Sequence, residues 1–111
     1  MKERFPGFDE SMKMMRSRDG ITSEIGFSWL SLFALEYGER LKEELDRETN
    51  HGLRCWLLEL IGLTKDEGNI ALFTEYLVSG DDSYRFWAIA GLRELNTADS
   101  RRMLFEAGVQ D

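Results

Sequence analysis

The sequence predicts an all-α protein, a short α-solenoid of stacked antiparallel helical hairpins. Three observations lead to this fold class. The only proline, Pro6, precedes every segment with helical periodicity. No stretch alternates apolar and polar residues for long enough to make a strand, and similar pairs of helices recur about every 31 residues. At 111 residues and 12.9 kDa, the chain is expected to form a single domain over residues 1–111.

We expect seven helices joined by short turns. Their predicted ranges are 9–18, 23–37, 39–48, 53–63, 67–78, 83–95 and 98–107. Ser23 is the predicted N-cap of the second helix, with Ile21 as its hydrophobic staple, and Asp82 is the predicted N-cap of the sixth. The tetrapeptide from Thr64 to Glu67 has the pattern of a capping box and would open the fifth helix.

The helices fall into two kinds. The second, fourth and sixth are apolar nearly all round, so each should be covered on several sides. The third is mostly charged and carries only Leu41 and Leu45 at an i,i+4 spacing, which places it on the outside. Glycines at positions 26, 62 and 91 are expected to let helices approach one another closely.

An internal repeat sets the predicted architecture. The motif Arg-x-Trp occurs at Arg54 and again at Arg85, 31 residues later, each time near the start of an apolar helix. A Leu-Phe pair at 72–73 recurs at 104–105, and a weaker copy of the unit precedes both. We therefore expect repeats over 21–49, 50–80 and 81–111, preceded by an N-terminal capping segment over 1–20.

Residues of about 50–108 resemble the HEAT-like repeat family, in particular the short type found in phycobilisome lyases. That type has an acidic cap, an arginine a few residues on, an Ala/Leu-rich helix, a tight turn and a second helix. The segment from Asp81 to Leu95 fits this pattern closely, whereas the segment from His51 to Arg54 fits less well because Asn50 or His51 replaces the acid. The resemblance implies stacked helical pairs and a protein-binding role, and it implies no catalytic activity.

The resemblance also implies structural roles. Arg54 and Arg85 would lie between repeats and pair either with an acid, Asp81 or Asp82 being candidates, or with carbonyl groups of a neighbouring helix. Two tryptophans of the repeated motif are expected to be core anchors rather than ligand contacts; they are Trp56 and Trp87.

Candidate catalytic groups are few. His51 and Cys55 are the only histidine and the only cysteine. A Cys–His dyad is disfavoured because Cys55 lies in an apolar stretch, where burial raises the pKa of a thiol. These two residues are also too few for a zinc site, and no Glu-x-x-His motif suggests a di-metal bundle. We expect no enzymatic activity, no cofactor and no metal.

The charge balance points to the class of partner. Twenty-one acidic and fourteen basic residues give a net charge of −7, which argues against nucleic acid. No segment has the length and composition of a membrane span or a signal peptide, and the single cysteine suits a reducing compartment, so we expect a cytoplasmic protein.

An acidic binding face follows from the resemblance, because in HEAT-like stacks the second helix of each pair lines the concave side. The predicted partner-binding residues are Glu39, Glu43, Asp46, Glu67, Glu75 and Tyr76, with Arg101 and Arg102 as basic exceptions. The alternative for the charges of the third helix is a structural role, in which they form ion pairs with one another at i,i+4 and stabilise an exposed helix. The pairs would be Lys42/Asp46, Arg40/Glu44 and Glu43/Arg47.

These features together predict a non-catalytic binding protein. The favoured concrete role is a bacterial immunity protein that occludes the active site of a basic toxin domain, a nuclease by preference. One alternative is a lyase-like or chaperone-like protein acting on a cofactor-bearing partner, which predicts a ligand-sized apolar pocket beside Trp56 or Trp87. Another is an adaptor that self-associates through its apolar end, as a homodimer involving Leu104, Phe105 and Val109.

The segment 1–20 is basic and rich in methionine. Two roles stay open for it: a cap whose methionines cover the first apolar helix, or a helix that binds a partner or a membrane surface.

Overall fold

The computed structural model describes residues 4–109, and all regular structure within them is helical. The predicted all-α class is therefore confirmed. In chain order the elements are α1 (Phe8–Met15), α2 (Gly20–Phe33), the 3₁₀ turn η1 (Ala34–Tyr37), α3 (Gly38–Arg47), α4 (His51–Leu63), the 3₁₀ turn η2 (Glu67–Asn69), α5 (Ile70–Leu77), α6 (Asp82–Leu95) and α7 (Ala98–Glu106).

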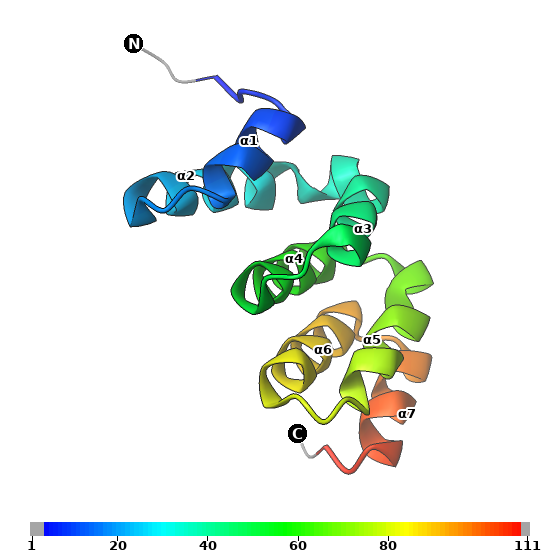
Figure 1. Cartoon of the computed structure of the whole chain (residues 1–111). Coiled ribbons are helices and arrows are strands. Elements are labelled where there is room, and N and C mark those ends of the chain that lie inside the picture. Colours follow the sequence, from blue (N-terminus) through cyan, green and yellow to red (C-terminus); the bar gives the residue numbers. More distant parts are fainter. Residues whose placement is uncertain (1–3, 110–111) are drawn as a thin grey trace.

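The helices form an elongated body of 48 × 25 × 23 Å. α2, α4 and α6 follow one another along one side, α3, α5 and α7 follow along the other, and α1 packs on α2 (Figure 1). The closest approaches of sequential helices join α1 to α2, α3 to α4 and α5 to α6. Of its two neighbouring long helices, α5 packs more extensively on α6 than on α4.

α2 begins three residues earlier than predicted, because Asp19 and not Ser23 is its N-cap. A carboxylate oxygen of Asp19 accepts hydrogen bonds from the backbone N–H of Thr22 at 3.1 Å and from its hydroxyl at 2.5 Å. Ile21, the predicted staple, is 72% exposed. The helix ends at Phe33, and the chain continues to Tyr37 in a tighter 3₁₀ turn.

The predicted capping box of the fifth helix is also wrong. Thr64 lies at the C-terminal end of α4, where its hydroxyl donates to the carbonyl of Ile61 at 2.7 Å. Lys65 then adopts a left-handed conformation with φ 52°, which turns the chain away from the helix axis. Asp66 caps η2 instead, by accepting from the N–H of Gly68 at 2.9 Å, and α5 starts only at Ile70.

The cap of α6 lies one residue before the predicted position. Asp81, and not Asp82, is the N-cap, since its carboxylate accepts from the N–H of Tyr84 at 2.9 Å. At the other end of the chain, Thr97 and Ser100 form a true capping box at the start of α7.

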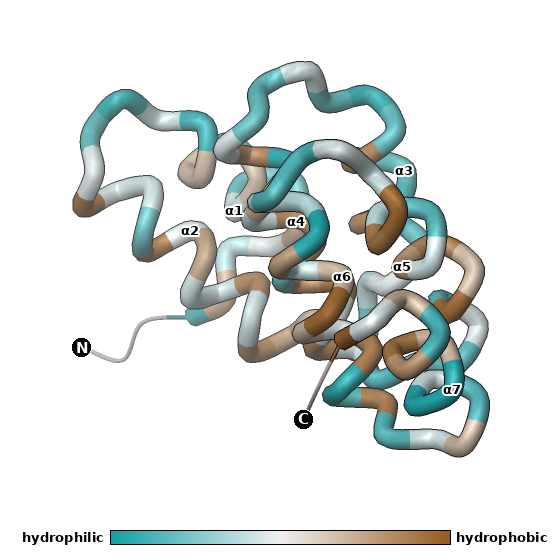
Figure 2. Tube along the Cα trace, turned by 90° about the horizontal axis from the view of Figure 1, so that it is seen from below, coloured by the Kyte–Doolittle hydropathy of each residue, from teal (hydrophilic) through white to brown (hydrophobic). Residues whose placement is uncertain are grey.

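The core runs the length of the molecule, but it does not cover the apolar helices on every side. α3 contributes only Leu41 and Leu45, both fully buried, as its narrow apolar stripe predicts. Figure 2 shows α3 as largely hydrophilic, with hydrophobic residues recurring along α2, α4 and α6. α2 packs on α1 and on α4, but its remaining side is uncovered, because Ile25 and Leu32 are exposed.

Glycines mark the closest helix crossings, as predicted. A Cβ atom added to Gly26 on α2 would lie 2.6 Å from the carbonyl oxygen of Ser11 on α1. A Cβ on Gly62 of α4 would lie 3.3 Å from the Cα of Gly91 on α6. These helix pairs therefore pack backbone against backbone, and a side chain at either site would separate them.

Candidate protein-binding surface

Arg54, in the first turns of α4, connects four helices. Its Nη1 donates to the carbonyl oxygens of Leu45 at 2.6 Å and Glu48 at 2.8 Å, at the end of α3. Its Nε donates to the hydroxyl of Tyr84 on α6 at 3.0 Å, and its Nη2 donates to the hydroxyl of Tyr76 on α5. This half-buried guanidinium thus fixes α3, α5 and α6 around the start of α4.

Arg85 on α6 stands 31 residues after Arg54 and makes a similar contact. Its Nη1 donates to the carbonyl oxygen of Leu77, in the last turn of the preceding helix, at 3.1 Å. Of the partners that the sequence left open, both arginines therefore contact backbone carbonyls of a neighbouring helix. Asp81 pairs with His51 instead, and Asp82 is exposed and forms no ion pair within residues 4–109.

His51 contacts two residues at the start of α6. Its Nε2 lies 2.8 Å from a carboxylate oxygen of Asp81, and its ring stacks on Tyr84 with centroids 4.8 Å apart. Burial, together with the negative charge of Asp81, raises the pKa of the half-buried Cys55 thiol. The thiolate that nucleophilic chemistry requires is therefore disfavoured at Cys55.

In the part of the chain that the structure describes, no group of three or more His, Cys, Asp or Glu side chains is placed to hold a metal ion. No helix among residues 4–109 is long and apolar enough to cross a membrane.

The two tryptophans of the repeated motif sit between helices. Trp56 packs on Phe27 of α2 with ring centroids 4.9 Å apart, and so joins α2 to α4. It also borders an open cleft of about 400 Å³, whose lining includes the polar Arg16, Ser17, Ser23 and Asn50. Trp87 lines an apolar groove of only about 140 Å³ between α4 and α6. Small-molecule sites usually measure about 300–1,000 Å³ and are mainly apolar, so neither hollow matches the predicted ligand pocket.

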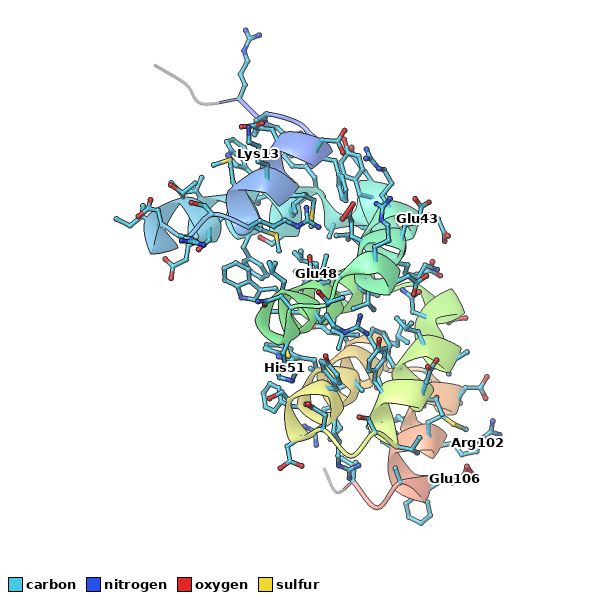
Figure 3. All side chains as sticks on the ribbon, viewed as in Figure 1. Lys13, Glu43, Glu48, His51, Arg102 and Glu106 are labelled. Carbon is cyan, nitrogen blue, oxygen red and sulfur yellow. The ribbon has the colours of Figure 1, made fainter. Side chains whose placement is uncertain are left out.

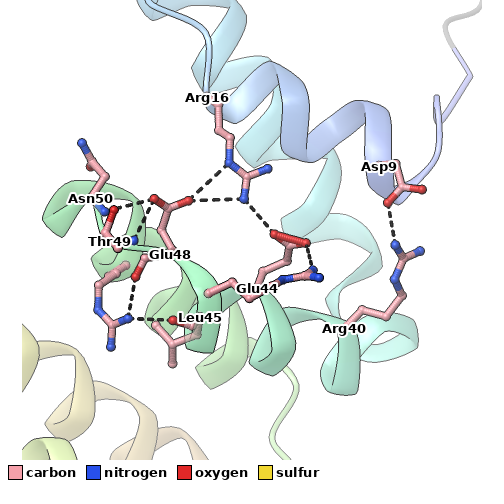
Figure 4. A network of polar contacts seen from close by, with 10 residues as sticks. Asp9, Arg16, Arg40, Glu44, Leu45, Glu48, Thr49 and Asn50 are labelled. Atoms are coloured by element: carbon pink, nitrogen blue, oxygen red, sulfur yellow. Dashed lines mark hydrogen bonds and ion pairs between the residues drawn. The ribbon is translucent and has the colours of Figure 1, made fainter.

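Several acids of α3 are neutralised by neighbouring cations. Glu44 forms ion pairs with Arg16 at 2.7 Å and Arg47 at 2.6 Å, and Glu48 pairs with Arg16 at 3.3 Å (Figure 4). Arg16 and the backbone N–H of Asn50 hold the pKa of Glu48 below its ordinary value, although its burial opposes them. These contacts attach the end of α1 to α3.

The three ion pairs predicted along α3 are not formed. Arg40 reaches Asp9 on α1 at 2.5 Å instead of Glu44, because α1 lies across that face. Lys42 pairs at i,i+3 with Glu39 at 3.0 Å, and Arg47 pairs at i,i+3 with Glu44. Because Lys42 and Arg47 pair with other acids, their predicted partners Asp46 and Glu43 form no ion pair within the described residues.

Unpaired acids gather on the outer edge formed by α3 and α5, and we call Glu43, Asp46 and Glu75 the acidic edge. All three are exposed and form no ion pair with any residue of the described chain. Glu43 projects away from the body beside α3 (Figure 3). Both Asp46 and Glu75 lie close enough to Tyr76 for their charges to act on its hydroxyl, so the two helices bring these carboxylates together.

The remaining predicted binding residues are placed less favourably. Tyr76 is half-buried; burial raises its pKa, and its hydroxyl is used by Arg54. Glu67 is exposed but lies in η2, before the start of α5. Arg101 bonds the carbonyl and the side-chain oxygen of Asn96, both at 2.9 Å, and Arg102 pairs with Asp99 at 3.3 Å.

The fold and this surface define an all-helical protein whose second row of helices carries unneutralised acids. In comparison with known proteins, the chain matches no family model, no curated protein and no solved structure. The HEAT-like resemblance therefore rests on the residues of the chain itself.

Proposed function

We propose that this chain is a non-catalytic protein-binding module, built as a short HEAT-like stack, whose acidic edge binds a basic partner. The observation that carries the proposal is the set of three exposed carboxylates on α3 and α5 that have no counterion within the described residues. Neighbouring acids such as Glu44 and Glu48 are paired with arginines, so on α3 and α5 the unpaired charges are these three.

Equivalent contacts in successive units support the stacked architecture. Arg54 bonds the carbonyl of Leu45 at the end of α3, and Arg85 bonds that of Leu77 at the end of α5. The same relationship repeated after 31 residues is what a helical repeat produces, because each unit presents the same groups to the next.

Occlusion of a basic active site is the concrete mechanism that we favour. A net charge of −7 on 111 residues accelerates encounter with a basic surface, an effect that salt screens. Carboxylates of the acidic edge would pair with the lysines and arginines that otherwise hold substrate phosphates. A bacterial immunity protein directed against a nuclease toxin domain is the role that fits this chemistry best.

Charge reversal on the acidic edge tests this proposal. The probe is the C-terminal domain of the protein encoded directly upstream of this chain, immobilised for association measurements. We expect Glu43→Lys/Asp46→Lys to slow association at 20 mM salt about tenfold or more, and to have much less effect at 500 mM. The matched control is Glu10→Lys/Glu24→Lys, which makes the same charge change at exposed sites on α1 and α2.

Equal effects of the two double variants would show that net charge matters and the acidic edge does not. Absence of any complex with that domain, combined with no rescue of growth on co-expression, would reject the immunity role.

An adaptor is the alternative that a specific observation favours. The lyase-like alternative requires a ligand-sized apolar pocket beside a tryptophan, and the groove beside Trp87 holds only about 140 Å³. Self-association, by contrast, requires exposed apolar surface, and α2 presents such a surface.

A further inference from the structure

An apolar stripe runs along the outer side of α2 into η1. Ile21, Leu32 and Leu35 are 72%, 74% and 78% exposed, and Ile25 is 41% exposed. With Ser28 they stand at positions 21, 25, 28, 32 and 35, an alternation of four- and three-residue steps. This spacing is the one that places side chains along the contact seam of two paired helices.

The middle of the stripe forms one continuous surface. Ile25, Ser28, Trp29 and Leu32 together line a shallow groove on α2. The opposite side of the helix is held in place, because Gly26 packs on the backbone of α1 and Phe27 packs on Trp56. These contacts fix the orientation of α2, so the side chains of the stripe point toward solvent.

The sequence of the stripe is nearly self-complementary. Ser28, a small residue, lies at its centre; Ile21 and Leu35 lie seven residues to either side. In an antiparallel pair that crosses at Ser28, Ile21 of each copy comes level with Leu35 in η1 of the other, and Ile25 comes within one residue of the level of Leu32. An isologous contact requires this property, since each surface must match itself.

Charges at the two ends of the stripe match the same arrangement. Arg18 directly precedes α2 and Glu36 lies in η1, and both are exposed without an ion pair among residues 4–109. Antiparallel pairing places Arg18 of each copy near Glu36 of the other. Because the contact has two-fold symmetry, the dimer contains two equivalent Arg18–Glu36 pairs. Within α2 itself Glu24 is the only charged residue, so little repulsion arises in an otherwise acidic protein.

We propose that this chain forms a homodimer through an antiparallel, two-fold contact between the apolar stripes of α2. The dimer contact lies on a different face from the acidic edge, so the dimer can be tested independently of the proposed function. A contact between two helices of this length belongs at the small end of specific interfaces, below about 1,200 Å² in total, and we expect a weak dimer with a dissociation constant on the order of micromolar.

Analytical ultracentrifugation of the full chain over about 1–500 µM tests the proposal in the range where such a dimer dissociates. We expect a concentration-dependent shift from monomer to dimer that Leu32→Asp weakens more than tenfold. The matched control is Val78→Asp, which places the same charge at an apolar residue of similar exposure, 77% against 74%, at the end of α5. Circular dichroism should show unchanged helicity for both variants.

A charge exchange establishes the direction of pairing. Arg18→Glu should weaken the dimer, and Arg18→Glu/Glu36→Arg should restore it, which a parallel pair cannot do because it would place like residues together. A chain that stays monomeric at every concentration overturns the proposal. So does a dimer that Phe105→Asp dissociates and Leu32→Asp leaves intact, since the exposed Phe105 of α7 would then form the interface.

Discussion

The ring of Phe73 on α5 lies directly against the backbone of Gly91 on α6, where a Cβ atom would come within 2.5 Å of the ring Cζ. Phe73 is 1% exposed and cannot move into solvent. Gly62 of α4 meets Gly91 at the same place, so three helices converge on a point that only glycine permits. This point holds α5 close to α6.

Gly91→Ala should lower the free energy of unfolding by about 1–3 kcal/mol, because the added methyl group must displace a buried ring. Urea denaturation measures the change. Gly20→Ala is the control, since a Cβ there has no neighbour within 4 Å and the helix propensity of alanine is higher; its stability should be unchanged or slightly raised. A smaller side chain at position 73 makes room for the added methyl group, so the double variant Phe73→Leu/Gly91→Ala should lose less stability than the sum of the two single variants. Additive losses would contradict the contact.

Arg54→Ala should destabilise the fold by about 2–4 kcal/mol, because it removes a charged donor from four acceptors on three helices. Arg85→Ala removes a single such bond, to Leu77, and should cost about 1 kcal/mol. Thermal and urea unfolding of both variants give the comparison. Equal losses would mean that the three additional hydrogen bonds of Arg54, to the carbonyl of Glu48 and to the hydroxyls of Tyr76 and Tyr84, contribute nothing.

Asp81 should make the stability depend on acid pH. The hydrogen bond from the backbone N–H of Tyr84 lowers the pKa of Asp81 most, and the imidazole of His51 lowers it further. Desolvation of the carboxylate opposes both effects. Since the folded pKa lies below the unfolded value of about 3.9, the stabilisation is present above that pH and is lost as the pH falls through the folded pKa.

The difference in stability between the wild type and Asp81→Ala should therefore stay constant above about pH 5 and shrink as the pH falls from about 4 to about 2. Asp82→Ala is the matched control at the neighbouring exposed acid, which caps no helix. A difference that stays constant over this range would show that the carboxylate charge of Asp81 is not involved.

Glu59 should have the opposite effect. It lines the groove between α4 and α6, and burial raises its pKa. An acid whose folded pKa is raised destabilises the protein above that pKa, and the penalty is absent below the unfolded value of about 4.3. Glu59→Gln should thus raise Tm at pH 7 and leave it unchanged near pH 4. The exposed Glu24→Gln on α2 should show no such pH-dependent gain.

The sequence patterns predicted which residues pack closely between helices, but they mostly did not predict the partners of the polar side chains. Gly62 and Gly91 were identified because a glycine inside an apolar helix loses stability unless a neighbour needs the space. The ion pairs of α3 were predicted wrongly, because the pattern within one helix cannot show that α1 lies across it and supplies Arg16 and Asp9. Glu43 and Asp46 remain unpaired for the same reason.

The sequence by itself determined that the chain is helical, where most of its helices lie, and that its acids outnumber its bases by seven. These are local or summed properties, set by periodicity, caps and composition. Only the tertiary structure decided which carboxylates keep a free charge, how α5 sits against α6 and which side of α2 stays uncovered. Each of these depends on contacts between residues about 15 to 30 positions apart, such as Phe73 with Gly91 and Arg54 with Tyr84, and such contacts exist only once the helices have packed.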